Sequence, residues 1–330
     1  MEQLRKKVSI VMCTYNGSRY IRQQLDSIIN QTYPLYEIII QDDLSSDDTE
    51  TIVKEYIQKY PYISFFKNSK RLGYNLNFKT ASMKATGDFV ALSDQDDVWM
   101  PQKIEMQMMT IKDHDICFSS HLCGTDMEHT NLVSSNYSLE KLVFEGFAGH
   151  TMLLRRDFIQ QDSVWIKDLY YDWSLAINAQ LRNGIVKIEA PLNWHRSHVD
   201  SAAQSQHSKY FPNEREHRSF MPYLYGLSSF RKLQQEPLWN RLYTFIYDNT
   251  NKEGEKTTHM ICKLMLRHDT LSLLRLCFVC MVKREYIYPN TKACKGIMGL
   301  IRGFFFPLIF SYHNTTFYLE SKTDATSLAH

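Results

Sequence analysis

Short apolar runs alternate with helical patterns along the first part of the chain. Strands are predicted at VSIVMC (8–13), YEIIIQ (36–41), ISFF (63–66) and DFVALS (88–93). Helices are predicted between them at IRQQLDSIINQ (21–31), SSDDTETIVKEYIQKY (45–60) and FKTASMKA (78–85). Because the strands are apolar on both faces, the pattern predicts an α/β fold in which helices cover a parallel sheet.

Polar residues directly follow three of these strands, at TYN (14–16), DDLSSDD (42–48) and DQDD (94–97). Ligands of parallel sheets bind beyond the carboxyl ends of the strands, so we expect these segments to line one crevice. The three carboxylates of DQDD repel one another unless a cation or several hydrogen-bond donors hold them. An EF-hand is excluded, because its loop requires Gly at the position of Trp99.

Composition narrows the classes of protein. The chain has 330 residues, 44% of them hydrophobic, which provides a sizeable core and excludes general disorder. With 38 Lys and Arg against 36 Asp and Glu, it lacks the basic excess of a nucleic-acid-binding protein. Seven cysteines without paired spacing, and no signal peptide, predict a reducing, cytoplasmic location. Cys277 and Cys280 lie in an apolar run and are predicted to be buried thiols.

Four segments in this order carry a family resemblance: VSIVMCTYNGSRYIRQQLDSI, EIIIQDDLSSDDT, ATGDFVALSDQDDVWMPQKI and YYDWSLAINAQ. They resemble the family 2 glycosyltransferases, in particular bacterial polysaccharide enzymes often labelled rhamnosyltransferase-like. The resemblance covers about residues 7 to 200. It implies the GT-A fold, a nucleotide-diphosphate sugar donor, Mn²⁺ or Mg²⁺, and inversion at the anomeric carbon. The expected acceptor is a hydroxyl of a glycan or a lipid-linked glycan in surface polysaccharide synthesis.

The metal site follows from the family's DXD element, which corresponds to Asp94-Gln95-Asp96. Asp96 is expected to contact the metal, and Asp94 a metal-bound water or the donor ribose, because Mg²⁺ and Mn²⁺ prefer carboxylate oxygens. In NWHRSHVDSAAQ, the resemblance assigns His198 to the metal or the diphosphate and Arg196 to phosphate. Asp97 is predicted instead to cap the following helix.

The nucleotide site is implied in the same way. Thr14, Tyr15 and Asn16 match family positions that contact the nucleotide, and Asp43 matches the acid that accepts a hydrogen bond from the base. Arg71 is a candidate for the base or a phosphate, and a solvated surface arginine is the open alternative.

The general base of the inverting reaction is assigned to Asp172, in YYDW at the start of a predicted helix. Asp172 also suits the N-cap of that helix, and Tyr171 stands where many relatives have Glu or His. Upstream, Gly146 and Gly149 are expected to let the backbone approach the sugar. His150 is either a donor contact or an ordinary loop histidine.

The catalytic domain is predicted to span residues 1–205, and residues 206–330 to form a mainly helical region. Residues 251–310 contain ten Lys and Arg against four acids, interleaved with LLRLCFVCMVKR (273–284) and GIMGLIRGFFFPLIF (296–310). The first run is too short to span a membrane, and Arg302 and Pro307 interrupt the second. This pattern predicts peripheral contact with the anionic inner face of a membrane, with an internal helical subdomain or a homodimer contact as alternatives.

Two other functions stay open. A sugar-phosphate nucleotidyltransferase shares the sheet and the acids, but usually has a Gly-rich basic loop that TYNGSRY matches poorly. A non-catalytic sugar-nucleotide or glycan-binding module would be expected to have lost an acid, yet Asp43, Asp94, Asp96 and Asp172 are all present. A metal-dependent inverting glycosyltransferase is therefore the leading hypothesis.

Overall fold

The computed structural model describes residues 6–198, 221–250, 253–287 and 294–327, with side chains described as far as residue 314. The chain divides into two compact units. The first comprises Met1–Ser135 and Gly146–Ser197, and the second Asn136–Glu145 and His198–His330. The predicted boundary after residue 205 falls outside the described residues.

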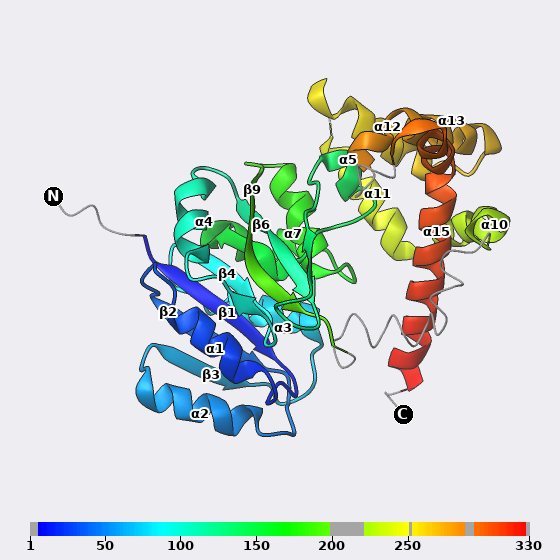
Figure 1. Ribbon diagram of the computed structural model, residues 1–330. Helices are drawn as coiled ribbons and strands as arrows, with labels where there is room; N and C mark the ends of the chain where they lie inside the picture. Colours follow the sequence, from blue (N-terminus) through cyan, green and yellow to red (C-terminus); the bar gives the residue numbers. More distant parts are fainter. Residues whose placement is uncertain (1–5, 199–220, 251–252, 288–293, 328–330) are drawn as a thin grey trace. The chain divides into compact units, whose positions relative to one another are not determined.

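A single sheet forms the centre of the first unit (Figure 1). In it, β1 (Val8–Thr14) lies between β2 (Glu37–Asp42) and β4 (Phe89–Ser93), and β3 (Ile63–Lys67) pairs with β2. All four strands run parallel, as their apolar faces predict. Their carboxyl ends therefore meet at one edge of the sheet, where the polar segments follow.

The other half of the sheet is mixed, which the sequence pattern did not resolve. Beyond β4 the order is β8 (Met152–Arg155), β6 (Ile116–Gly124), β9 (Ile185–Arg196) and β5 (Val98–Trp99), with β7 (Thr130–Val133) paired to β6. Strand β8 is antiparallel to both of its neighbours, and β5 is antiparallel to β9. The β5–β9 pair matters for the site, because it brings the end of the DQDD segment beside β9.

Helices cover the sheet of the first unit. They are α1 (Ile21–Ile29), α2 (Thr49–Lys59), α3 (Tyr74–Ser82), α4 (Lys103–Ile111), α6 (Arg156–Ile159) and α7 (Tyr171–Gln180), with single turns at Gly149–Thr151 and Asp162–Val164. Apolar faces of α1 and β1 meet in the core, where Leu25 and Ile10 are fully buried. Gln102 is the N-cap of α4, so the prediction that Asp97 caps this helix is wrong.

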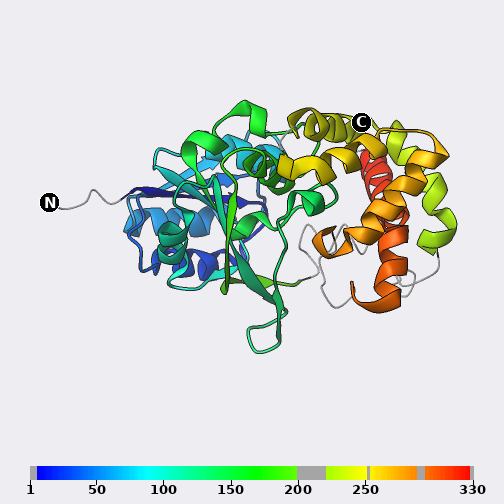
Figure 2. The same ribbon diagram turned by 90° about the horizontal axis from the view of Figure 1, so that it is seen from above.

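The second unit is helical in its described part. It contains α5 (Leu139–Leu142), α10 (Met221–Gln235), α11 (Pro237–Asn249), a turn at Glu253–Glu255, α12 (Lys256–Met265), α13 (Thr270–Val282), α14 (Arg284–Ile287) and α15 (Gly296–Ser327). Helix α15 packs along α10 and α13 (Figures 1 and 2). Its Phe310 is buried against Trp239 and Phe144, with ring centroids 5.4 and 5.1 Å away. Cys277 and Cys280 are buried and free, as predicted.

Helix α15 corrects one expectation. It runs without a break through Arg302 and Pro307. By length and composition its segment Gly296–Asn314 could cross a membrane, with a mean hydropathy of 1.2 and 28% of its residues buried. The buried core helix of a water-soluble protein passes the same test, so the helix does not decide between crossing and packing.

Candidate active site

The turns after β1 and β2 are tied together by hydrogen bonds. The Thr14 hydroxyl donates to Asp42 Oδ1 at 2.7 Å, and the Asn16 N–H donates to Ser45 Oγ at 2.9 Å. In return, Asn16 Oδ1 accepts from the Ser46 N–H at 2.9 Å. Two of the three predicted polar segments, 14–16 and 42–48, therefore lie together at the same edge of the sheet. The hydroxyl of Thr14 is buried and already engaged, so its predicted nucleotide contact would have to use the backbone.

Tyr15, Gln95 and Arg71 form one surface at this edge. The Tyr15 N–H donates to Gln95 Oε1 at 2.9 Å, and Gln95 Nε2 donates to the Tyr15 carbonyl at 3.0 Å. The Arg71 guanidinium lies 3.5 Å above the centre of the Tyr15 ring, in a cation–π contact. The contact between Arg71 and Tyr15 brings two of the predicted nucleotide residues together. The hydrogen bonds of Gln95 link the DXD segment to the turn after β1.

Asp43 organises the loop that carries Arg71. Its buried carboxylate accepts from the N–H groups of Leu72 at 2.7 Å and Gly73 at 2.9 Å, and from Asn68 Nδ2 at 2.9 Å. Gly73 has a φ of 75°, which glycine adopts without strain. The structure thus gives Asp43 a structural role. Its predicted contact with a base remains a prediction.

Four residues form a compact group at the end of β4, which we call the acid–imidazole cluster: Asp94, Asp97, His150 and His195. Each offers a ligand atom, and these atoms all lie within 4.8 Å of one another. Of the predicted metal ligands, only Asp94 belongs to this group. Sequence reasoning missed His195, and assigned Asp97 and His150 to other roles.

Asp97 is the centre of the cluster and is fully buried. Its Oδ1 lies 2.8 Å from His195 Nδ1 and its Oδ2 lies 3.0 Å from His150 Nδ1. The two imidazole rings stack with centroids 4.7 Å apart, and His121 meets His150 edge-on at 4.9 Å. Two imidazoles thus flank one carboxylate.

The charges in this cluster shift one another's pKa. Burial alone would raise the pKa of Asp97, but the charge and hydrogen bonds of His150 and His195 outweigh it and lower that pKa. Burial would lower the pKa of His195, but its hydrogen bond and attraction to Asp97 raise it to about 9. At neutral pH, His195 and Asp97 therefore form a charged pair.

Asp94 differs from Asp97, because no described residue donates a hydrogen bond to its carboxylate. Burial and the negative charges of Asp97 and Asp96 raise its pKa well above the usual range. Because burial and neighbouring acids disfavour the negative form of Asp94, a cation that approaches it stabilises that form. Asp94 is therefore the open position of the cluster.

Arg196 lies beside Asp96 at the end of β9. Its Nε donates to the Asp96 carbonyl at 3.2 Å, its Nη2 donates to Gln23 Oε1 at 2.5 Å, and its guanidinium lies 4.5 Å from the Tyr20 ring. A positive charge thus stands next to the DXD segment, and its role toward phosphate remains a prediction. His198 falls in the second unit, so its metal role also remains a prediction.

Asp172 lies in the first turn of α7, after the N-cap Tyr170. Its Oδ1 accepts from the Trp173 N–H at 2.8 Å. Burial raises the pKa of Asp172 to about 6, and its negative charge contributes to the raised pKa of Asp94. A carboxylate with a pKa near neutrality can remove a proton at physiological pH.

Gly146 and Gly149 serve packing against α7. A Cβ atom at Gly146 would lie 2.7 Å from Trp173 Cβ, and one at Gly149 would overlap the Tyr171 hydroxyl. The space beside both glycines is filled by α7. The glycines thus let α7 pack closely and bring Asp172 to the site. The expected approach of their backbone to the sugar remains a prediction.

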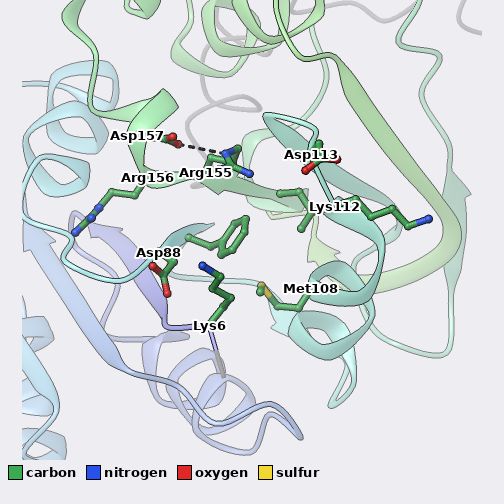
Figure 3. Close-up of a pocket in the computed structure, with 10 residues that line it drawn as sticks. Lys6, Asp88, Met108, Lys112, Asp113, Arg155, Arg156 and Asp157 are labelled. Atoms are coloured by element: carbon green, nitrogen blue, oxygen red, sulfur yellow. Dashed lines mark hydrogen bonds and ion pairs between the residues drawn. The ribbon is translucent and has the colours of Figure 1, made fainter. Parts of the chain in front are cut away.

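A pocket of about 500 Å³ lies at the other edge of the sheet (Figure 3). Its lining includes Lys6, before β1, and Asp88, before β4, so it is at the amino ends of these strands. Arg155 Nε donates to Asp157 Oδ1 at 3.3 Å, so two charged side chains of the pocket lining pair with each other. None of the residues predicted to act in function line this pocket.

Comparison with known proteins agrees with this geometry. Residues 9–166 match the family described as glycosyl transferase family 2. The chain is 35% identical over 111 residues to the Escherichia coli enzyme UDP-Glc:alpha-D-GlcNAc-diphosphoundecaprenol beta-1,3-glucosyltransferase WfgD, covering 34% of this chain and 43% of that one.

Two solved structures share the fold across nearly the whole chain. S. aureus TarS 1-349 in complex with UDP-GlcNAc aligns with a TM-score of 0.55 at 14% identity, over 96% of this chain and 92% of that one. The Pyrobaculum calidifontis mannosyltransferase PcManGT, in complex with GDP-Man and Mn²⁺, aligns with a TM-score of 0.55 at 14% identity, over 95% and 88%.

Residues 9–166 form a family 2 glycosyltransferase domain, and the chain has the GT-A fold. It spans about two fifths of the length of the curated relatives that it matches. The family and the fold implied by the resemblance of the four sequence segments are confirmed.

Proposed function

We propose that this protein transfers one sugar from a nucleotide-diphosphate sugar to a hydroxyl of a lipid-linked glycan, with inversion at the anomeric carbon. The bound nucleotide sugars of two structural neighbours support the donor class. The diphosphoundecaprenol acceptor in the name of WfgD supports a lipid-linked acceptor. Transfer would take place at the cytoplasmic face of the membrane, in synthesis of a surface polysaccharide.

The observation that carries the proposal is the pairing of two unlike carboxyl groups. Asp94 is open and surrounded by negative charge, whereas Asp172 is held by a backbone N–H and has a pKa of about 6. The negative charge of Asp172 contributes to the raised pKa of Asp94, so the two carboxyl groups lie close enough to interact. A single displacement requires this arrangement, with one group on the leaving diphosphate side and a base for the acceptor hydroxyl.

Different residues of the chain would bind the nucleotide, bind the diphosphate and remove the proton. Tyr15, in the turn after β1, and Arg71, on the loop that Asp43 holds, provide an aromatic and cationic surface for the nucleotide. Arg196 places positive charge beside the DXD segment, which favours a diphosphate. Asp172 accepts the proton of the acceptor hydroxyl as the new glycosidic bond forms and the bond to the diphosphate breaks.

The donor set at the end of β4 fits a divalent cation. Asp94 has an unshielded carboxylate, and Asp96 follows two positions later with a half-buried one. Asp97 is already paired with two imidazoles, so we assign the cation to Asp94 and Asp96 and a supporting role to Asp97. When bound, Mn²⁺ or Mg²⁺ would stabilise the charge that develops on the leaving diphosphate.

A donor screen tests the proposal. The protein is incubated with a panel of UDP-, GDP- and dTDP-sugars, and release of the nucleoside diphosphate is measured with Mn²⁺, with Mg²⁺ and with EDTA. We expect release from one donor class that depends on the metal and is lost in Asp96→Asn. The matched control is Asp162→Asn, an exposed acid paired with Lys79 at 2.8 Å, which should behave like the wild type.

Each other outcome identifies a different function. Full activity in EDTA would contradict the metal role. Pyrophosphate release from a nucleoside triphosphate and a sugar phosphate would indicate a nucleotidyltransferase. Tight donor binding without turnover, in the presence of acceptor lipids, would indicate a binding module.

A further inference from the structure

Helix α13 exposes a row of large apolar side chains. Leu271, Leu274, Phe278 and Val282 are between 45% and 65% exposed. Their spacing of three, four and four residues places them on one side of a helix, whereas Leu276, on the other side, is fully buried. The helix is therefore apolar on both sides, and only one side is used by the core of the second unit.

The first turns of α15 extend this row. Ile297, Met298 and Ile301 are between 41% and 76% exposed. The two helices approach closely at Gly303, where an added Cβ would lie 3.0 Å from the Met281 Cα. Phe304, one turn after Ile301, meets Phe278 with ring centroids 5.2 Å apart. The exposed residues of the two helices thus join at this aromatic pair. We call them the α13–α15 face: Leu271, Leu274, Phe278, Val282, Ile297, Met298 and Ile301.

Positive charge accompanies this face. Residues 270–314 contain six Lys and Arg against one acid, Glu285. Arg275 lies on α13 within the exposed row, and Lys295 and Arg302 are exposed beside Ile297 and Ile301. No described residue forms an ion pair with these three basic side chains. Glu285 is 3.8 Å from Arg284, so it does not neutralise them.

We infer that the α13–α15 face docks on a membrane surface that contains anionic lipids. Its apolar side chains would enter the boundary between headgroups and acyl chains, and Arg275, Lys295 and Arg302 would contact the phosphate groups. A second copy of the chain fits less well. A two-fold contact through this face would oppose its positive charges with the same charges of the partner.

This face is narrower than the membrane contact predicted from the two apolar runs 273–284 and 296–310. In FFFPLIF, Phe310 is buried and Phe306 packs edge-on against Phe144 at 5.0 Å, so these rings belong to the core of the second unit. Removing α15 would destroy that core, which makes truncation an unsuitable test. Point substitutions on the exposed row avoid this problem, because the row contributes little to the packing.

Vesicle cosedimentation of the full chain tests the inference without any donor or acceptor. The vesicles are phosphatidylcholine, alone or mixed with phosphatidylglycerol. We expect binding to the mixed vesicles at low salt and release at about 1 M salt, where charge is screened within about 3 Å. Leu271→Glu with Val282→Glu should weaken binding at least tenfold, and Arg275→Gln with Arg302→Gln should weaken it on anionic vesicles alone.

The matched control is Met109→Glu with Leu132→Glu. These two apolar residues, on α4 and β7, are exposed at 70% and 61%, like those of the face. This variant should bind as the wild type does, and circular dichroism should show that all variants are folded. Equal binding to neutral and anionic vesicles, or binding to neither, would overturn the inference. So would a dimer in sedimentation velocity that the Leu271→Glu, Val282→Glu variant dissociates.

Discussion

The strand-end site and the α13–α15 face depart from the usual distribution of side chains in opposite directions. At the site, Asp97 is fully buried and paired with two imidazoles. On the face, Leu271 and Val282 are more than half exposed. Buried charge and exposed apolar surface both cost stability, and each is the kind of exception that indicates function. The first suits chemistry on a charged donor, and the second suits contact with lipid.

The largest effect is expected at Asp172. Asp172→Asn should lower turnover about 10²–10⁴-fold, the usual contribution of a general base, with donor affinity nearly unchanged. Asparagine keeps an acceptor for the Trp173 N–H, so α7 should stay in place. Steady-state kinetics and donor titration separate the two effects, with Asp162→Asn as the surface control. A fall of less than about tenfold would place the base elsewhere.

The next largest effect is expected on stability, from the loss of the buried Asp97 carboxylate. Asp97→Asn should lower the free energy of unfolding by about 3–5 kcal/mol, because it removes the counter-charge of the half-buried His195 and the carboxylate beside the buried His150. Asp162→Asn, which breaks an exposed pair with Lys79, should cost about 1 kcal/mol or less. Urea denaturation measures both. Equal losses would show that burial does not distinguish the two pairs.

This pair also predicts a pH dependence of stability. The pKa of His195 is raised to about 9 in the folded protein, above its usual value near 6.5. Its contribution is therefore fully present below about pH 6.5 and is lost as the pH rises through about 9. The stability difference between the wild type and Asp97→Asn should shrink over that range. A constant difference would contradict the charged pair.

A smaller loss of stability is expected at Gly149, which packs against α7. Gly149→Ala should lower stability by about 1–3 kcal/mol, because the added methyl overlaps Tyr171, and it should also reduce turnover by shifting Asp172. Gly254→Ala is the control, since an added Cβ there meets nothing within 4 Å. Thermal unfolding and activity are measured together. An unchanged Gly149→Ala protein would mean that the glycine is not needed for packing.

The smallest change expected is in the pH profile of the reaction. The pKa of Asp172 is about 6, and the base acts as the carboxylate. We therefore expect kcat/KM to rise about tenfold per pH unit below 6 and to level off above it. The residual activity of Asp172→Asn should lack this step. A wild-type profile that is flat between pH 5 and 7 would exclude Asp172 as the titrating base.

The sequence predicted the parallel strands and their common edge, because β-branched runs and the polar residues after them are local signals. It could not predict the acid–imidazole cluster. His195 meets Asp97 because strand β5, which has only the two residues Val98 and Trp99, pairs with β9. So short a strand leaves no periodic pattern in the sequence. A weak signal existed in NWH (193–195), where residues 193 and 195 lie on one side of the strand.

The same limit applies to the second unit. The run LLRLCFVCMV is apolar at nearly every position, so its pattern cannot show which side of α13 faces the core. The packing of Gly303, on α15, against Met281, on α13, determines which side of α13 faces the core. For this reason the sequence predicted a lipid contact for both apolar runs as a whole, whereas Phe310 of the second run lies in the core.

The central claim is a single displacement in which Asp172 is the base opposite the diphosphate. The stereochemistry of the product tests it most directly. Once the screen has identified a donor, NMR spectroscopy during turnover gives the anomeric configuration of the first product formed. We expect the configuration opposite to that of the donor, and retention of the donor configuration would contradict a single displacement.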